Sequence, residues 1–339
     1  MTEAGRHGDY GYCITIMNVL VVGYGSIGKR HVSNLSNLDC IDKIIIYTKV
    51  KDDLENKYEK RNVFVDATIL DLTAVANQYK IDFAIIANET YKHIDAALLL
   101  AEKGIHLFVE KPLSHNLEKI DLLKEFVQKK QLKVFVAYNL RYLPAIQYLK
   151  NQISEKIIGA LCFAEIEVGQ YLPEWRPLRD YRKSYSARED QGGGVALDLS
   201  HEIDYMRYLF GDPVLWKTMK SKASNLEIDS EDIFKGIYRF SGGFMCSVNM
   251  DYIRRDKKRI INIIGREGSL ECDFIKKFIK IQKNSDEISL IEDARLFDVD
   301  ESYRRELNYF IECIGKDKTT EITLADGIEV LKLIGGDHA

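Results

Sequence analysis

The stretch Val21-Val-Gly-Tyr-Gly-Ser-Ile-Gly-Lys-Arg-His31 joins a short apolar run to an amphipathic segment and carries three glycines in the spacing G-x-G-x-x-G. In a strand–turn–helix unit, the first glycine permits a tight turn and the second lets a pyrophosphate approach the backbone. The third allows close packing of the helix on the strand. The helix N-terminus then offers free N–H groups to an anion. We therefore predict dinucleotide binding, with a glycine-rich turn in another α/β protein as the alternative. The predicted contacts are Gly23, Gly25, Ser26, Ile27 and Gly28.

Strand-like and helix-like patterns alternate from residue 18 to about residue 137. Short apolar runs begin near residues 18, 44, 63, 83, 106 and 133, and helical patterns separate most of them. This alternation is typical of a parallel sheet covered by helices. After about residue 157, strand-like runs are joined by short turns such as Ser241-Gly-Gly243, which indicates antiparallel pairing. We predict an α/β protein with an N-terminal Rossmann dinucleotide-binding domain at 17–139. A C-terminal α/β domain at 140–339 has an open, mostly antiparallel sheet.

Composition narrows the class of protein. A net charge of −4 gives no reason to expect a nucleic-acid partner. The six cysteines are isolated, so neither a metal site nor a disulfide framework is indicated. No apolar run approaches the roughly 20 residues of a membrane helix, and no signal peptide is evident, so we expect a cytoplasmic protein. Residues 1–16 precede a second methionine, Met17, and we expect them to form an N-terminal extension.

The end of the second apolar run bears on the choice of dinucleotide. An NAD-preferring site has an acidic residue about 20 residues after the glycine loop, where it binds the ribose hydroxyls. Here Thr48 and Lys49 follow Tyr47, and the nearest acids are Asp52 and Asp53. A hydroxyl and a cation suit a 2′-phosphate, so we predict NADP in preference to NAD. The alternative is that Lys49 and Lys51 are solvated surface charges.

Two later segments hold candidates for catalysis. Lys111, in Glu110-Lys-Pro112, directly follows an apolar run, and ligands gather at the carboxyl ends of parallel strands. A surface turn is the alternative for this tripeptide. In the helix expected at about 197–210, Asp198, His201 and Tyr205 lie opposite an apolar stripe. The alternative here is a solvated polar face, but Gly192-Gly-Gly194 upstream allows close approach of a ligand or another backbone.

Several ordered motifs together carry a family resemblance. VGYGSIGKRH, IIANETYKHIDAALLLAEKGIHLFVEKPL, VAYNLRYLP and GGGVALDLSHEIDYMRYLFG resemble the glucose–fructose oxidoreductase/inositol dehydrogenase (Gfo/Idh/MocA) family, over nearly the whole chain after Met17. The resemblance implies that Lys111 hydrogen-bonds a reacting hydroxyl and that His201 transfers its proton, with Asp198 nearby. The family commonly has its histidine four residues after the aspartate, whereas here the two are three apart. It also implies cofactor contacts by Asn88, Glu89, His93, Glu110 and Lys111.

The segment 171–185 is rich in arginine and aromatic residues and is interrupted by two prolines. Such a loop can stack on sugar faces and bind phosphate or carboxylate, although a surface loop or a subunit contact has a similar composition. The segment also resembles members of the family from sugar-biosynthesis gene sets. The predicted substrate contacts are Asn139, Arg141, Tyr142, Trp175, Arg176 and Arg182.

The resemblance implies an NAD(P)-dependent oxidoreductase that transfers hydride to or from a carbon of a sugar or sugar derivative, which could be nucleotide-linked or an acidic amino sugar. Two alternatives stay open. One is a glycosidase that uses bound NAD in a closed redox cycle, and the other is a non-catalytic, dinucleotide-sensing regulator. Many members of the family pair through the open sheet, so a homodimer or homotetramer is expected.

Overall fold

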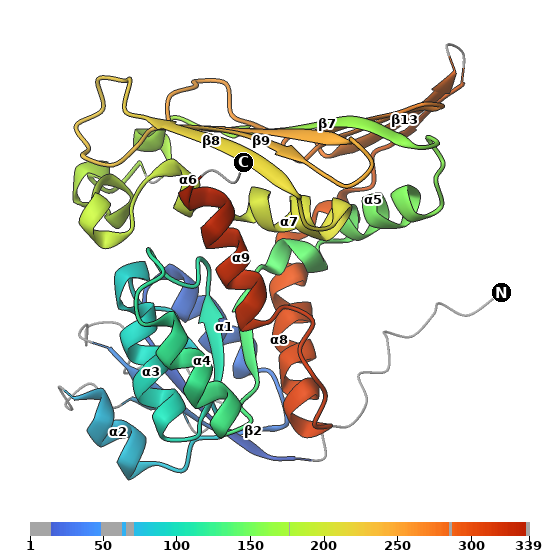
Figure 1. Cartoon of the computed structure of the whole chain (residues 1–339). Helices are drawn as coiled ribbons and strands as arrows, with labels where there is room; N and C mark the ends of the chain where they lie inside the picture. Colours follow the sequence, from blue (N-terminus) through green and yellow to red (C-terminus); the bar gives the residue numbers. More distant parts are fainter. Residues whose placement is uncertain (1–14, 49–62, 66–70, 176, 285–286, 337–339) are drawn as a thin grey trace.

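Figure 1 shows a computed structural model of the chain with two sheets, one above the other. The structure describes residues 15–48, 63–65, 71–175, 177–284 and 287–336. Sheet A, the lower one, is six-stranded and parallel, with the order β3-β2-β1-β4-β5-β6. Its strands are β1 (Met17–Val22), β2 (Ile41–Tyr47), β3 (Val63–Val65), β4 (Phe83–Ile86), β5 (His106–Glu110) and β6 (Val134–Ala137).

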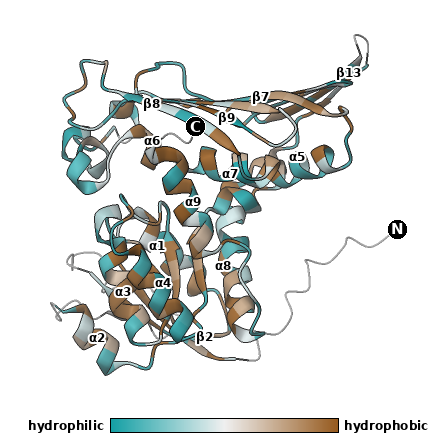
Figure 2. Cartoon of the chain, in the orientation of Figure 1, coloured by the Kyte–Doolittle hydropathy of each residue, from teal (hydrophilic) through white to brown (hydrophobic). Residues whose placement is uncertain are grey.

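The strands of sheet A are buried because they are continuous runs of apolar residues. All four residues of β4 and of β6 are buried, as are four of the five residues of β5. Continuous apolar runs of this kind belong to parallel strands with both faces covered. The connecting helices are α1 (Ser26–Leu35), α2 (Leu72–Gln78), α3 (His93–Glu102) and α4 (Ile120–Lys129), with the short η1 (Thr90–Lys92) before α3. Figure 2 shows the apolar residues gathered in these strands and on the helix faces that turn toward them.

Sheet B is eight-stranded, with the order β14-β13-β12-β11-β7-β10-β9-β8. Each described neighbouring pair is antiparallel except β7 and β10, so the predicted mostly antiparallel sheet is confirmed. The strands are β7 (Leu161–Gly169), β8 (Leu215–Ser221), β9 (Ile233–Arg239), β10 (Met245–Asp251), β11 (Lys258–Gly265), β12 (Gly268–Asp273), β13 (Phe278–Asn284) and β14 (Glu287–Ile291).

Helices fill the space between the two sheets. In Figure 1, α5, α6 and α7 lie on the face of sheet B that is turned toward sheet A, and the other face of sheet B is bare in the described part of the chain. The helices beyond β6 are α5 (Pro144–Ser154), α6 (Val195–Asp198), α7 (His201–Phe210), α8 (Val299–Gly315) and α9 (Leu324–Gly335). Short turns of 3-10 helix are η2 (Asn139–Tyr142), η3 (Leu172–Glu174), η4 (Tyr181–Lys183), η5 (Tyr185–Ala187), η6 (Glu189–Gln191) and η7 (Ala294–Phe297).

The last two helices fasten the sheets together. On α8, the ring of Phe310 packs 5.5 Å from Phe83 of β4 and 5.6 Å from Phe108 of β5. On α9, Gly327 lies so close to Val136 of β6 that an added Cβ would come within 3.0 Å of it. The same helix accepts a 3.1 Å hydrogen bond at the carbonyl of Leu333 from Tyr238 of β9. Helix α8 thus packs on sheet A, and α9 contacts both sheet A and sheet B.

No helix in the described residues is both long and apolar enough to cross a membrane.

Candidate active site

The glycine loop leaves the N-terminus of α1 open. Gly23 has φ +100°, and a Cβ there would lie 2.6 Å from the carbonyl oxygen of Ala87, so only glycine fits. Gly25 is the N-cap of α1, and a Cβ on it would meet nothing within 4 Å. As a glycine, Gly25 has no side chain with which to cap α1, and the first turn of this helix has no acidic residue. A glycine loop that leads into a helix N-terminus of this kind fits the pyrophosphate of a dinucleotide.

The neighbouring strands supply the rest of this edge. Thr48 follows β2 and is buried, next to Tyr47, whose carbonyl accepts a 2.9 Å hydrogen bond from Gly23. Lys49, the other residue predicted to select NADP, lies outside the described residues. Beyond β4, the side-chain oxygen of Asn88 is buried with no partner in the described residues, while Glu89 is exposed and pairs with Lys92 at 3.0 Å. An orphaned buried amide oxygen at this edge is the kind of group that a bound ligand satisfies.

His93 connects the loops that follow two strands. Its Nδ1 lies 2.9 Å from the carbonyl oxygen of Pro112, and its Nε2 lies 3.1 Å from that of Asn88. The ring is buried, and burial lowers the pKa of His93 below its ordinary value. Both ring nitrogens thus face backbone carbonyls. His93 therefore ties the loop after β4 to the loop after β5, and its direct contact with the cofactor stays a prediction.

Lys111 leaves the carboxyl end of β5 and reaches across to the other sheet. Its Nζ donates a 2.6 Å hydrogen bond to the backbone carbonyl of Asp198, and the Lys111–Pro112 peptide is cis. Burial lowers the pKa of Lys111, while the carboxylates of Asp198 and Glu110 oppose that effect. The strand-tip location predicted from the alternating pattern is confirmed, and the alternative of a surface turn is excluded.

The helix predicted at about 197–210 is two helices. α6 ends at Asp198 and α7 begins at His201, because Leu199 has φ −101° and ψ 29°, outside the helical range. Asp198, His201 and Tyr205 are all buried, at 6%, 8% and 0% exposure, so the alternative of a solvated polar face was wrong. These side chains contact other parts of the protein instead: the carbonyl of Asp198 accepts from Lys111, and the Tyr205 hydroxyl donates to Glu202 at 3.4 Å.

The glycines before α6 make room for protein rather than open space. Gly194 has φ +110°, and a Cβ on it would collide with the carboxylate of Glu231. A Cβ on Gly193 would collide with the carbonyl of Tyr185. Glu231 also accepts a 3.2 Å hydrogen bond from the backbone N–H of Ala196. Gly193 and Gly194 therefore let η5 and Glu231 press against the start of α6, which helps to fix the position of Asp198.

Asp198 has a second partner that its sequence surroundings do not reveal. The hydroxyl of Tyr252, just after β10, donates a 2.6 Å hydrogen bond to Oδ2 of Asp198. Burial raises the pKa of Tyr252 well above its ordinary value, and the Asp198 charge raises it further, so this hydroxyl keeps its proton. Nothing in the sequence near residue 252 marks it, because only the folding of sheet B brings β10 to α6.

His201 is a neutral imidazole close to a cation. Burial lowers the pKa of His201 well below its ordinary value, and the charges of Lys111 and Arg259 lower it further. Its Nδ1 is buried with no partner in the described residues, and its ring packs edge-on at 5.7 Å against Tyr138. A neutral ring with a free lone pair can accept a proton from a hydroxyl held at Lys111.

Of the substrate contacts predicted in the loop 171–185, Trp175 lies next to the groups around Asp198. Trp175 is half-buried, its ring packs edge-on at 5.2 Å against Tyr252, and its Nε1 donates to the carbonyl of Gln170 at 3.1 Å. Arg182 is exposed and binds Asp180 and Glu227. Arg176 lies outside the described residues.

The residues of η2 predicted to contact substrate are engaged within the protein. Arg141 binds Asp204 through two nitrogens, at 2.6 and 2.9 Å, and Asp326 at 3.2 Å. Asn139 donates a 2.7 Å hydrogen bond to the hydroxyl of Ser302 on α8. Tyr142 is buried, with its hydroxyl lacking a partner in the described residues. These contacts favour a structural role for Arg141 and Asn139, in which they hold η2 to α7 and α8.

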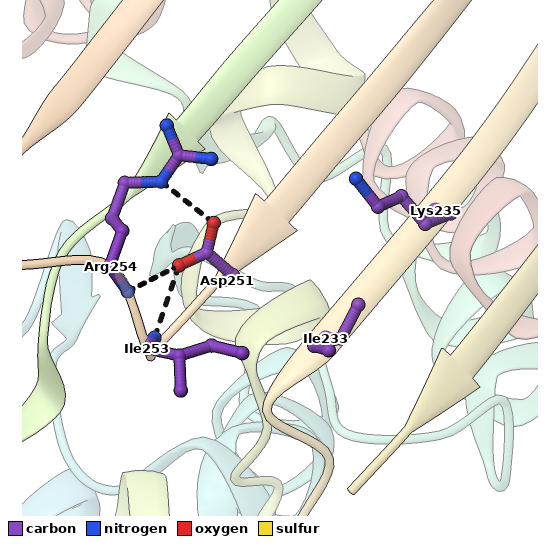
Figure 3. Close-up of a pocket in the computed structure, with 5 residues that line it drawn as sticks. All are labelled: Ile233, Lys235, Asp251, Ile253 and Arg254. Atoms are coloured by element: carbon purple, nitrogen blue, oxygen red, sulfur yellow. Dashed lines mark hydrogen bonds and ion pairs between the residues drawn. The ribbon is translucent and has the colours of Figure 1, made fainter. Parts of the chain in front are cut away.

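A pocket of about 330 Å³ lies elsewhere, on the bare face of sheet B (Figure 3). It is lined by Ile233, Lys235, Asp251, Ile253 and Arg254. Arg254 binds Asp251 at 2.8 Å and Glu167 at 2.7 Å, so the guanidinium of this pocket is already paired with carboxylates. The pocket is open and separate from the groups around Lys111.

The comparisons with known proteins agree with this arrangement. Residues 17–138 match the profile described as "Oxidoreductase family, NAD-binding Rossmann fold", and residues 146–271 match the "GFO/IDH/MocA C-terminal domain". The chain belongs to the Gfo/Idh/MocA family. It is an oxidoreductase with an NAD-binding Rossmann domain, which confirms the predicted family, fold class and enzyme class.

Relatives of this Gfo/Idh/MocA protein extend over nearly its whole length. Myo-inositol 2-dehydrogenase of Thermotoga maritima is 25% identical over 335 residues, which is 94% of each chain. The solved structure of levoglucosan dehydrogenase with NADH and levoglucosan has a TM-score of 0.80 at 21% identity, covering 94% of this chain and 96% of that one. The WlbA dehydrogenase from Bordetella pertussis, solved with NADH and UDP-GlcNAcA, has a TM-score of 0.75 at 18% identity and covers 95% of both chains.

Proposed function

We propose that this oxidoreductase transfers hydride between a nicotinamide dinucleotide and a CH–OH carbon of a sugar or cyclitol. One observation carries the proposal: Lys111 at the tip of β5 donates to the Asp198 carbonyl, beside the neutral ring of His201. These three groups lie at the carboxyl edge of the sheet whose glycine loop fits a dinucleotide. The relatives named as inositol and levoglucosan dehydrogenases support the substrate class.

Different residues would bind the dinucleotide, transfer the proton and stabilise the developing charge. Gly23, Gly25 and Gly28, with the first turn of α1 at Ser26 and Ile27, would hold the pyrophosphate, and the loop at Asn88 would meet the nicotinamide half. When bound, the dinucleotide supplies the hydride acceptor or donor. His201 removes the hydroxyl proton in the direction of oxidation and returns it in the direction of reduction. Lys111, as an ammonium, stabilises the negative charge that develops on the hydroxyl oxygen, and Asp198 holds Lys111 in place.

NADP is the proposed preference within this function. No acid stands between Tyr47 and Lys51, while Thr48 and Lys49 suit a 2′-phosphate. Titration of the protein with NADPH and NADH, followed by nicotinamide fluorescence, tests the preference, with Lys49→Asp as the matched variant. We expect tighter binding of NADPH by the parent and a reversed order in Lys49→Asp. Tighter binding of NADH by the parent would contradict the preference without touching the proposed reaction.

The substrate is best found by a screen that follows absorbance of the reduced nicotinamide. The panel contains cyclitols, neutral sugars, sugar acids and nucleotide-linked amino sugars, since Trp175 and the arginines of 171–185 suit a sugar face and an anionic group. Net reduction of NADP or NAD by one of these compounds supports the proposal. Glycoside cleavage without net reduction would favour the glycosidase alternative, and dinucleotide binding with no turnover on any compound would favour the regulator.

We propose further that the active protein is a cytoplasmic homodimer or homotetramer paired through the bare face of sheet B. Large apolar side chains are exposed on that face, namely Phe163, Met219, Ile237 and Met245. Apolar side chains gathered on one face are typical of protein interfaces. Light scattering after size exclusion should give a dimer or larger for the parent and a shift toward monomer for Ile237→Lys.

A further inference from the structure

His31 and Glu110 form a buried pair directly behind the catalytic lysine. Nε2 of His31 lies 2.6 Å from Oε1 of Glu110, and the two residues are 0% and 7% exposed. The other oxygen of Glu110 accepts a 3.3 Å hydrogen bond from the backbone N–H of Lys111. The Glu110 carboxylate therefore touches a side chain from α1 on one side and the backbone of Lys111 on the other.

The elements around this pair leave it little freedom. The His31 ring packs edge-on against Phe108 of β5, at 5.2 Å, and against Tyr303 of α8, at 6.2 Å. Arg30, the neighbour of His31, pairs with Asp300 of α8 at 3.4 Å. Three elements thus clamp the ring of His31, so a shift of α1 would be passed on to the carboxylate of Glu110.

A second acid, Glu306 of α8, lies near Glu110. Its side chain is fully buried, and neither of its oxygens has a partner in the described residues. Burial raises the pKa of Glu306 well above its ordinary value, and the Glu110 charge raises it further, which favours the protonated form of Glu306. Glu110 differs from Glu306 in having a partner: within the described part of the chain, His31 is the only side chain that hydrogen-bonds Glu110.

We propose that Glu110, held by His31, is the positioning residue of Lys111. The pair links α1, the helix at whose N-terminus the dinucleotide would bind, to the backbone of Lys111, whose ammonium would act on the substrate oxygen. Glu110 acts through Lys111 and does not itself meet the dinucleotide, unlike the direct cofactor contact predicted from the family resemblance. A buried carboxylate fixed on both sides is suited to this role, because a displacement of about 1 Å in a reacting group can cost about 100-fold in rate.

The first test removes the support of Glu110 and measures turnover. His31→Leu should lower kcat about 10- to 100-fold per folded molecule, with dinucleotide affinity changed by less than about threefold. His31→Gln, whose amide can still donate to Glu110, should recover kcat to within about tenfold of the parent. His106→Gln is the matched control, since His106 lies at the other end of β5, about 13 Å away, and accepts from the backbone N–H of Lys133.

The second test measures the pKa of Lys111 directly, in the protein without dinucleotide. The charged and titratable groups that face Lys111 are Glu110, Asp198, His201, Glu202 and Arg259. The Glu110 charge raises the pKa of Lys111, so Glu110→Gln should lower it. The pH midpoint for acetylation of Lys111 by acetic anhydride, followed by mass spectrometry, should therefore move to lower pH. The alkaline limb of kcat/KM should move in the same direction, because Lys111 loses its proton earlier.

Several results would overturn the positioning role. These are a kcat of His31→Leu within about threefold of the parent, a loss of kcat in His31→Gln equal to that in His31→Leu, or an unchanged acetylation midpoint in Glu110→Gln. If His31→Leu does not fold, the other two variants decide. The inference rests on the proposed role of Lys111, which Lys111→Ala tests separately. Loss of turnover in Lys111→Ala with none in the pair's variants would remove only the inference.

Discussion

The two halves of the candidate active site are built in different ways. Lys111 comes from the tip of a parallel strand, where the order of strands alone carries a side chain to the ligand edge. Asp198 and His201 come from two short helices that meet at a break, and their positions depend on Glu231, Tyr185 and Tyr252. The strand tip is therefore set by local sequence, and the helix pair by contacts with distant segments.

The largest expected loss of kcat comes from replacing Lys111 at the tip of β5. Lys111→Ala should lower kcat by about two to four orders of magnitude, since it removes the cation that stabilises the developing charge. His201→Ala should lower kcat by a similar factor, since it removes the group that transfers the hydroxyl proton. Steady-state assays of nicotinamide absorbance measure both.

Lys150→Ala is the matched control for these two variants. The Nζ of Lys150 also donates to a backbone carbonyl, that of Leu209 at 3.3 Å, but it is not part of the site. We expect its kcat to stay close to the parent's. Near-parent kcat in both Lys111→Ala and His201→Ala would refute the assignment of the site.

This difference explains how much of the molecule could be predicted from its sequence. The glycine loop, the parallel sheet and Lys111 follow from patterns within about 30 residues of each other or from strand order. Tyr252 could not be found, because its bond to Asp198 spans 54 positions and no motif marks it. The surroundings of Arg141 could not be predicted for the same reason: an arginine near a domain junction suggests a ligand, but its carboxylate partners in the fold lie far along the chain, at residues 204 and 326.

Arg141 offers the next largest effect, this time on stability. Its guanidinium is buried between Asp204 and Asp326, and Asp204 is almost fully buried. Removing one partner of a buried ion pair typically costs about 3–5 kcal/mol, because the other charge is left uncompensated. Arg141→Ala should lower the free energy of unfolding by about that amount in urea titrations, with KM unchanged in the folded fraction. A raised KM at parent-like stability would instead restore the predicted contact with substrate.

Tyr252→Phe should lower kcat by a smaller factor, because it affects only the position of Asp198 at the end of α6. The variant removes the 2.6 Å hydrogen bond to Asp198 and leaves the shape of the ring in place. We expect kcat to fall about tenfold, in line with the loss of one hydrogen bond to a charged group. Tyr238→Phe is the matched control, since Tyr238 is buried in sheet B and donates to the carbonyl of Leu333. Equal losses of kcat in the two variants would mean that Tyr252 acts through stability only.

Arg182 should give the smallest effect, although its sequence surroundings favour a ligand contact. All three of its guanidinium nitrogens donate to carboxylates, two to Asp180 and one to Glu227. These partners leave few donors for a substrate, and exposed ion pairs add little to stability. Arg182→Ala should therefore change KM less than about twofold and leave the melting temperature nearly unchanged.

A rise in KM of tenfold or more in Arg182→Ala, with kcat preserved, would reverse this conclusion. It would mean that substrate displaces Asp180 or Glu227 from the guanidinium and that the loop 171–185 rearranges on binding. Trp175→Ala serves as the comparison, because Trp175 packs against the Tyr252 ring that holds Asp198. If Trp175→Ala raises KM and Arg182→Ala does not, the substrate binds at the end of the loop that packs against Tyr252. The position of that end depends on contacts between segments that are distant in the sequence, as the positions of Asp198 and His201 do.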